Sequence, residues 1–257
     1  MSLNFCFIGA GNLATNLSKA FQNKGFNILQ IYSRTEKSAK ELADILSVKY
    51  TTSVNGINDN ADIYFVAIHD SAVTAVLSQI NFKNKLVVHC SGSLPLSAIA
   101  DFTENTGVFY PLQTFSKNRE VDFNEIPVFV ESNSLKNKET LLQIANSISK
   151  SVFEINSEKR KLLHISAVFA CNFVNHFYTI AAEILKSKNI PFEVLKPLIQ
   201  ETAKKVQELE PEKAQTGPAV RFDENIISAH LQALNDFDDY RQLYTSVSKS
   251  IFNHYKK

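Results

Sequence analysis

Two glycines near the start of the chain stand between a strand-like run and a helix-like run. Residues 4–8 (NFCFI) are apolar except for Asn4, and the turn Gly9-Ala10-Gly11-Asn12-Leu13-Ala14 follows them directly. In such a G-x-G-x-x-G/A turn, the first glycine permits a tight bend and the second lets a pyrophosphate approach the backbone. The free N–H groups of a helix N-terminus attract phosphate. The turn therefore predicts a dinucleotide site that includes Gly9, Gly11, Asn12 and Leu13, with an ordinary structural turn as the alternative.

The segment after the next strand candidate, residues 26–32, discriminates between two dinucleotides. Sites for NAD usually carry Asp or Glu about 20 residues beyond the glycines, where the carboxylate binds the ribose 2′-hydroxyl. This chain has Ser33-Arg34-Thr35 instead. Arg34 can bind a 2′-phosphate with two hydrogen bonds, the neighbouring hydroxyls can donate to it, and Lys37 can add charge. The pattern favours NADP(H), and the alternative is a solvated turn that happens to carry an arginine.

Two later strand candidates end in polar residues. Residues 63–68 (IYFVAI) lead into His69, and residues 86–89 (LVVH) lead into Cys90-Ser91. In open α/β sheets, ligands bind outside the C-terminal ends of the strands. We therefore expect His69 to pack near the ribose or nicotinamide and Ser91 to contact the nicotinamide amide. Cys90 has no partner base in the sequence, which favours a buried, inert thiol.

The segment 162–185 (LLHISAVFACNFVNHFYTIAAEIL) reads as an apolar helix with an unusual polar side. At 100° per residue, that side collects His164, Cys171, Asn172, Asn175, His176, Thr179 and Glu183. Amides and imidazoles suit a polar cleft or an interface, although they can also be satisfied within helix packing. Asn172 could hold a carbonyl or imine, and His164 is the candidate proton donor. No carboxylate accompanies the histidines at metal-ligand spacing, so we predict no metal site.

A second polar cluster, residues 216–223 (TGPAVRFD), connects two helix candidates. Asp223 is a suitable N-cap for the following helix. Arg221 could pair with a substrate carboxylate, or it could simply form an ion pair within the linker.

The elements that must position these residues alternate between strand and helix up to about residue 155. Near-continuous apolar strands separated by helices predict a doubly wound, mostly parallel α/β sheet. From about residue 157 the chain reads as helices alone. We therefore predict a nucleotide-binding domain over residues 1–156 and an all-helical domain over residues 157–257.

The overall composition excludes several classes of protein. The 257 residues carry a formal net charge of +1, which gives no electrostatic reason to expect nucleic acid or an anionic membrane as partner. Three cysteines without C-x-x-C spacing argue against a disulfide framework and for a reducing compartment. No signal peptide and no membrane span is predicted, which indicates a cytoplasmic protein.

The whole chain resembles the family of Rossmann-like proteins that carry a DUF2520 helical domain, whose members are often labelled NADP oxidoreductases. The resemblance rests on the glycine turn, Ser33–Thr35, HCSG at residues 89–92, YPLQTF at 110–115, the helix with Asn172, and TGPAVRFDENIISAHL at 216–231. The family is similar in architecture to pyrroline-5-carboxylate reductase and to the 6-phosphogluconate dehydrogenase superfamily. It implies a Rossmann domain, a helical domain that commonly forms homodimers, and a substrate cleft between them. This chain departs from the family at Phe222, where glycine is common, and at His69, where proline is common.

These features lead to one main functional expectation and to alternatives from other classes. The main one is an NADP(H)-dependent oxidoreductase that moves a hydride to or from a small carbonyl, imine or alcohol. The alternative is a non-catalytic NADPH-binding sensor or interaction protein. A methyltransferase is disfavoured, because Arg34 stands where such enzymes usually have an acid for the ribose hydroxyls.

Overall fold

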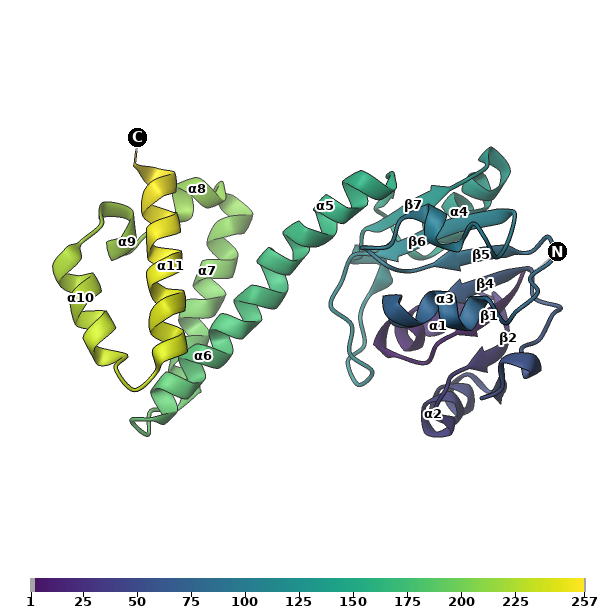
Figure 1. The fold of residues 1–257 in the computed structure, drawn as a ribbon, viewed down its shortest axis with the longest axis horizontal. Helices are drawn as coiled ribbons and strands as arrows, with labels where there is room; N and C mark the ends of the chain where they lie inside the picture. The colour runs from purple at the N-terminus through teal and green to yellow at the C-terminus, as the bar shows by residue number, and fades with distance from the viewer. Residues whose placement is uncertain (1–2, 257) are drawn as a thin grey trace. The chain divides into compact units, whose positions relative to one another are not determined.

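The computed structural model describes residues 3–256. Contacts divide the chain into two compact units, one up to Asn172 and one from Phe173 onwards. The first unit is an α/β structure and the second is helical, as the ribbon in Figure 1 shows.

Eight strands of the first unit form one sheet in the order β3-β2-β1-β4-β5-β6-β7-β8. Neighbouring strands from β3 to β6 are parallel, β7 is antiparallel to β6, and β8 is parallel to β7. The order reverses between β1 and β4, which makes the sheet doubly wound and confirms the predicted fold class. The strands are β1 Asn4–Ile8, β2 Asn27–Tyr32, β3 Lys49–Thr51, β4 Ile63–Val66, β5 Leu86–His89, β6 Asn105–Pro111, β7 Val128–Ser132 and β8 Val152–Glu154.

Both faces of the sheet are covered, because side chains alternate along each strand. On β1, Phe5 and Phe7 belong to one buried cluster, whereas Cys6 and Ile8 belong to the other. The first cluster takes in apolar residues of α1 (Asn12–Asn23), α2 (Glu36–Leu46) and α4 (Leu135–Ile148). The second takes in residues of α3 (Val73–Leu77) and of the 3-10 turn Leu96–Ile99. The sheet therefore has an apolar core on each side, as the apolar sequences of its strands predict.

After β8 the described residues form helices and the loops between them, with no further strand, which confirms the predicted change of character. The short helices α8 and α9 were not anticipated by the sequence pattern. The helices are α5 Ser157–Ala167, α6 Val174–Lys186, α7 Lys196–Glu208, α8 Pro211–Ala214, α9 Pro218–Arg221, α10 Glu224–Ala233 and α11 Asp238–Tyr255. The Asp223 carboxylate accepts a hydrogen bond from the Ile226 N–H at 3.3 Å, so Asp223 caps α10 as expected.

A π-helical stretch, Val168–Phe173, joins α5 to α6, so that Ser157–Lys186 forms one long helix. The division between the two units falls within this helix, beyond the predicted domain boundary at residues 156/157. The reason is that Arg160 of α5 is buried and forms an ion pair with Glu131 on β7, which attaches this helix to the sheet. By length and composition alone the long helix could cross a membrane. One such helix is weak evidence for a span, since core helices of soluble proteins pass the same test.

Candidate functional site

Gly9 occupies a position that no other residue could fill. Its φ is +125°, and a Cβ built there would lie 2.2 Å from the carbonyl oxygen of Ala67. Its N–H donates to the Tyr32 carbonyl at 2.8 Å. The turn after β1 is thereby held between the ends of β2 and β4, at the point where the strand order reverses. This is the position where a doubly wound sheet binds a ligand.

Gly11 marks open space at the start of α1. It is the N-cap of that helix, with extended backbone and no side-chain cap, and a Cβ there would meet nothing within 4 Å. Asn12 is exposed and Leu13 half-buried, whereas Ala14 is fully buried and lets the helix approach the sheet. The helix carries no acidic residue in its first turn. Uncapped N–H groups, room for a ligand and no repelling charge together fit a pyrophosphate.

The end of β2 places a cation beside this turn. Arg34 and Thr35 are exposed and Ser33 is half-buried, directly after Tyr32. Within residues 3–256, the Arg34 guanidinium pairs with no carboxylate, whereas the Lys37 ammonium lies 4.0 Å from Glu41. A guanidinium not engaged in an ion pair remains able to bind a phosphate with two hydrogen bonds.

The ends of β4 and β5 are joined by the Ser91 hydroxyl. It donates to the Asp70 carboxylate at 2.9 Å and accepts from the N–H groups of Ser93 and Leu94, each at 3.0 Å. His69, immediately before Asp70, is exposed. Ser91 therefore holds the loop after β5 in place, and a contact from its hydroxyl to a nicotinamide amide would compete with these bonds.

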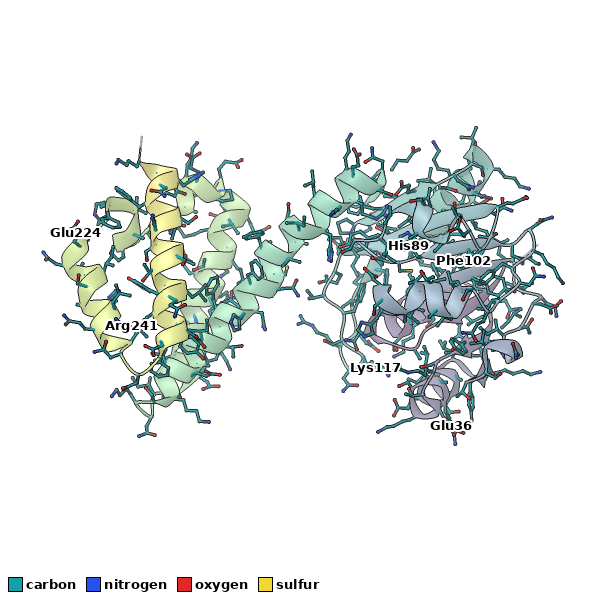
Figure 2. All side chains as sticks on the ribbon, in the orientation of Figure 1. Glu36, His89, Phe102, Lys117, Glu224 and Arg241 are labelled. Carbon is teal, nitrogen blue, oxygen red and sulfur yellow. The ribbon has the colours of Figure 1, made fainter. Side chains whose placement is uncertain are left out.

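His89 and Cys90, at the end of β5, are buried and do not titrate near neutral pH. Burial, aided by the positive charge of Arg160, lowers the pKa of His89 to about 3. The His89 Nδ1 accepts from the Ser91 N–H at 3.2 Å (His89 is labelled in Figure 2). Burial raises the pKa of the Cys90 thiol to about 12, which confirms the prediction of an inert thiol.

Arg160 is fully buried, which the basic run Lys159-Arg160-Lys161 did not suggest. Its guanidinium forms an ion pair with Glu131 and donates to the Leu94 carbonyl. The same carboxylate accepts from the backbone N–H of Ser157, at 3.0 Å, and from its hydroxyl. These bonds attach the start of α5 to β7 and to the loop after β5.

The attachment of α5 brings His164 to the same edge of the sheet. The His164 Nδ1 and the Tyr110 hydroxyl share a hydrogen bond of 2.9 Å, and Gly92 lies directly against both rings. Tyr110, on β6, was not singled out by sequence reasoning. The one signal that could have identified it is the YPLQTF motif at residues 110–115, which begins at the end of the buried strand β6.

The other predicted substrate residues lie elsewhere. Asn172 is exposed in the π-helical stretch, and Arg221 is exposed at the end of α9 in the helical unit. Among the described residues, neither forms a hydrogen bond with another predicted site residue. A π-helix advances by a smaller angle per residue than an α-helix, because it closes i→i+5 bonds. The π-helical stretch therefore changes the angles of the later polar residues relative to His164 from those calculated at 100° per residue.

Comparisons with known proteins agree with this arrangement. The family model described as "NADP oxidoreductase coenzyme F420-dependent" matches residues 4–92, and the DUF2520 model, a domain of unknown function, matches residues 126–251. A crystal structure from Bacteroides fragilis, described as a "putative NADP oxidoreductase", is 50% identical, with 98% of each chain covered and a TM-score of 0.95. The chain belongs to this DUF2520 oxidoreductase family. No curated protein matches the chain.

Two solved structures of lower identity share the fold of this DUF2520 protein. A 1-pyrroline-5-carboxylate reductase from Streptococcus pyogenes is 15% identical, over 98% of this chain and 99% of that chain, with a TM-score of 0.65. An imine reductase from Myxococcus stipitatus in complex with NADP⁺ is 16% identical, over 98% and 93%, with a TM-score of 0.64. The family and the Rossmann-type sheet assign the chain to nicotinamide-dependent oxidoreduction in general, without a substrate.

Proposed function

We propose that this protein is an NADP(H)-dependent oxidoreductase that moves a hydride to or from a small carbonyl, imine or alcohol. The observation that carries the proposal is the turn from Gly9 to Gly11, which combines an enforced backbone bend with open space at an uncapped helix N-terminus. The family assignment supports the same chemistry. A bound NADPH would supply the hydride, while the protein binds, orients and manages one proton.

The first unit offers a group for each part of the cofactor. The amides of Gly11, Asn12 and Leu13 would bind the pyrophosphate, and Gly9 gives the turn its shape. Ser33, Arg34 and Thr35 would hold the 2′-phosphate, with Lys37 adding charge nearby. His69 and Ser91, at the ends of the strands in the second half of the sheet, would face the nicotinamide side.

Three residues are assigned to the substrate. Asn172 has an amide that can hydrogen-bond a carbonyl oxygen or an imine nitrogen. Arg221 can pair with a substrate carboxylate. His164 has an imidazole, whose ring nitrogens can hold and pass on a proton.

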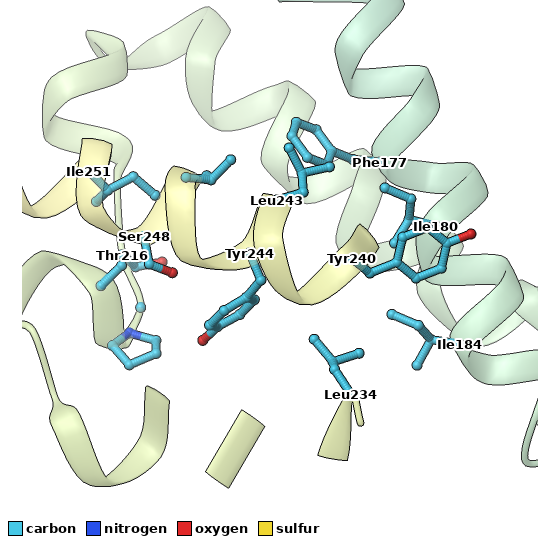
Figure 3. A pocket seen from close by; sticks show the side chains of 14 residues that line it. Phe177, Ile180, Ile184, Thr216, Leu234, Tyr240, Leu243, Tyr244, Ser248 and Ile251 are labelled. Atoms are coloured by element: carbon cyan, nitrogen blue, oxygen red, sulfur yellow. The ribbon is translucent and has the colours of Figure 1, made fainter. Parts of the chain in front are cut away.

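We also propose that the protein forms a homodimer through its helical unit. Large apolar side chains of this unit are exposed, among them Phe177 (41%), Val194 (56%) and Leu198 (62%). Residues of α6, α9 and α11 also line an apolar cavity of about 320 Å³, shown in Figure 3. Exposed apolar surface on this scale usually marks an interaction site, and a second copy offers a surface of the same apolar character.

Parallel fluorescence titrations with NADPH and NADH test the proposed cofactor. The chain has no tryptophan, so the nicotinamide signal stands on a low protein background. We expect NADPH to bind at least about tenfold more tightly than NADH, because charge-assisted hydrogen bonds to the 2′-phosphate contribute about 1.5–3 kcal/mol. Binding of neither nucleotide would contradict the proposal.

Turnover is tested next, with the oxidation of bound NADPH followed at 340 nm against cyclic imines, keto acids and aldehydes. An Asn172→Ala variant that binds NADPH normally should lose most of the rate. Tight binding of NADPH with no oxidation by any compound would instead favour a non-catalytic NADPH sensor.

A further inference from the structure

Tyr110 and His164 form a hydrogen-bonded pair within the first unit. The Tyr110 hydroxyl and the His164 Nδ1 are 2.9 Å apart, and the two rings meet edge to face at a centroid distance of 5.9 Å. Tyr110 is 8% exposed, whereas His164 is half-buried. One member of the pair is thus held in the protein and the other keeps a route to solvent.

The absence of a side chain at Gly92 leaves room for the Tyr110 and His164 rings. A Cβ at Gly92 would lie 2.6 Å from the His164 Nδ1 and 2.9 Å from the Tyr110 ring. Its backbone is not in the left-handed region, so the turn itself does not require glycine. The requirement is close packing, which places the loop after β5 directly against the two polar rings.

The topology places the pair in the nicotinamide half of the proposed cofactor site. In a doubly wound sheet, each half binds one mononucleotide across the point where the strand order reverses. Arg34 follows β2, in the half formed by β1, β2 and β3, so that half takes the adenosine. Tyr110 is on β6 and Gly92 follows β5, in the half formed by β4, β5 and β6. This half remains for the nicotinamide.

Resting on the proposed function, we infer that Tyr110 is the proton donor to the substrate and that His164 replaces its proton. Reduction of an imine or carbonyl adds a hydride to the carbon and one proton to the nitrogen or oxygen. The Tyr110 O–H bond breaks as the new N–H or O–H bond forms. The phenolate then takes a proton from the His164 Nδ1 while the Nε2 takes one from solvent, so the imidazole relays the proton with no net change in its charge.

The surroundings of Tyr110 suit this role. Burial raises the pKa of its phenol, so the O–H is intact at neutral pH and available to donate. The buried Arg160 opposes that increase, because its positive charge stabilises the phenolate that donation leaves behind. Arg160 and its partner Glu131 also fix the helix that carries His164.

The position of the pair can be tested without turnover, by NMR of protein containing ¹⁵N-labelled histidine. The His164 ring signals are identified by their loss in His164→Gln. We expect NADP⁺ to shift them, and 2′-phospho-ADP-ribose, which lacks the nicotinamide, to leave them in place although it binds. Failure of both ligands to bind would overturn the proposed function and this inference together. Binding of NADP⁺ without a shift of the His164 signals would overturn this inference alone.

The proton transfer is tested with two substrates that differ in their need for a proton. At pH 8.5, 3,4-dihydroisoquinoline must gain a proton on reduction, whereas N-methyl-3,4-dihydroisoquinolinium already carries the positive charge. Tyr110→Phe should lower kcat for the first by about 100-fold or more, the usual contribution of a positioned acid, and for the second by less than about threefold. Equal losses for both compounds, or none, would exclude Tyr110 as the donor. If the wild-type protein reduces neither compound, the proposal that Tyr110 donates a proton during imine reduction is overturned.

Tyr64→Phe is the matched control. The Tyr64 hydroxyl is also buried in the first unit and donates to the Asn58 carbonyl at 2.8 Å. This control also removes one hydrogen bond from a buried tyrosine hydroxyl. It should leave the His164 NMR signals where they are in wild type, and kcat for both substrates within about twofold of wild type. His164→Asn keeps an amide near Tyr110 but cannot relay a proton, and should lower kcat for the neutral imine by about tenfold. Full activity in His164→Asn would remove His164 from the relay.

Discussion

The two units of this chain bury their hydrophobic side chains to very different extents. In the first unit, the rings of Phe5, Phe21, Phe26, Phe65 and Phe109 contact one another with centroid separations of 4.9 to 5.8 Å. Among the described residues of the helical unit, only Ile180, Ala219, Ile227 and Ser248 are buried. The first unit therefore has a core of its own, whereas the second leaves most of its apolar side chains at least partly exposed.

The largest expected effect sharpens this contrast directly. Phe21 is fully buried, so Phe21→Ala should lower the free energy of unfolding by about 3–5 kcal/mol, through lost burial and a cavity. Leu198→Ala, at a side chain 62% exposed, should cost less than about 1 kcal/mol in dilute protein. Urea unfolding followed by circular dichroism measures both. A loss of several kcal/mol for Leu198→Ala at low concentration would mean that the helical unit has a tighter core than its exposure indicates.

The second effect concerns what covers the helical unit. Phe177→Asp places a carboxylate beside the apolar cavity and should weaken the proposed dimer by about 2–4 kcal/mol, or roughly 30- to 1000-fold. Ile45→Asp makes a similar change at a side chain 55% exposed in the first unit and should leave association unchanged. Sedimentation equilibrium over a range of concentrations distinguishes the two variants. A dimer of wild-type strength in Phe177→Asp would move the interface away from this cavity.

The third effect concerns the first unit's cofactor. Arg34→Ala should weaken NADPH binding by about 1.5–3 kcal/mol, roughly 10- to 150-fold, while NADH binding changes less than about threefold. The reason is that only NADPH carries the 2′-phosphate that Arg34 would bind. Fluorescence titration gives both constants. Equal losses for the two nucleotides would remove Arg34 from the phosphate site.

The smallest effect is an acid sensitivity that belongs to the first unit. The pKa of His89 is about 3 in the folded protein, against about 6.5 when unfolded, so the unfolded state binds more protons between these values. Stability from this group is complete above pH 6.5 and is lost as the pH falls towards 3. At pH 5.5 the loss should be about 1.4 kcal/mol, and His89→Gln should not show it. The urea unfolding midpoints of wild type and His89→Gln, measured at pH 7.5 and 5.5, test this prediction. An equal decrease of the midpoint in the two proteins would contradict it.

Local patterns predicted most of the fold, because strands buried on both faces and amphipathic helices leave strong signals in sequence. The short edge strand Lys49–Thr51 was missed, since its residues are polar and mostly exposed. The π-helical stretch was also missed, because it has no recognised local signature in the sequence.

Some residues of the candidate site could likewise be predicted from local sequence, and others could not. The glycine turn and Arg34 lie within short segments and could be identified from sequence. Tyr110 and His164 are 54 positions apart, so their pairing depends on how α5 is attached to the sheet. The burial of Arg160 could not be predicted from the run of three cations at residues 159–161, because it depends on the distant carboxylate of Glu131.

The antiparallel pairing of β7 with β6 has a consequence for how such chains can be recombined. The DUF2520 model starts at residue 126, before β7, yet β7 aligns with β6 from Gly107 opposite Ser132 to Pro111 opposite Val128. The segment that matches the DUF2520 model therefore includes α4 and the strands β7 and β8, and these two strands belong to the sheet of the first unit. A chimera joined at residue 126 must rebuild that pairing from two parents. One joined after Asn172 keeps the sheet, the Arg160–Glu131 ion pair and the Tyr110–His164 pair from a single parent.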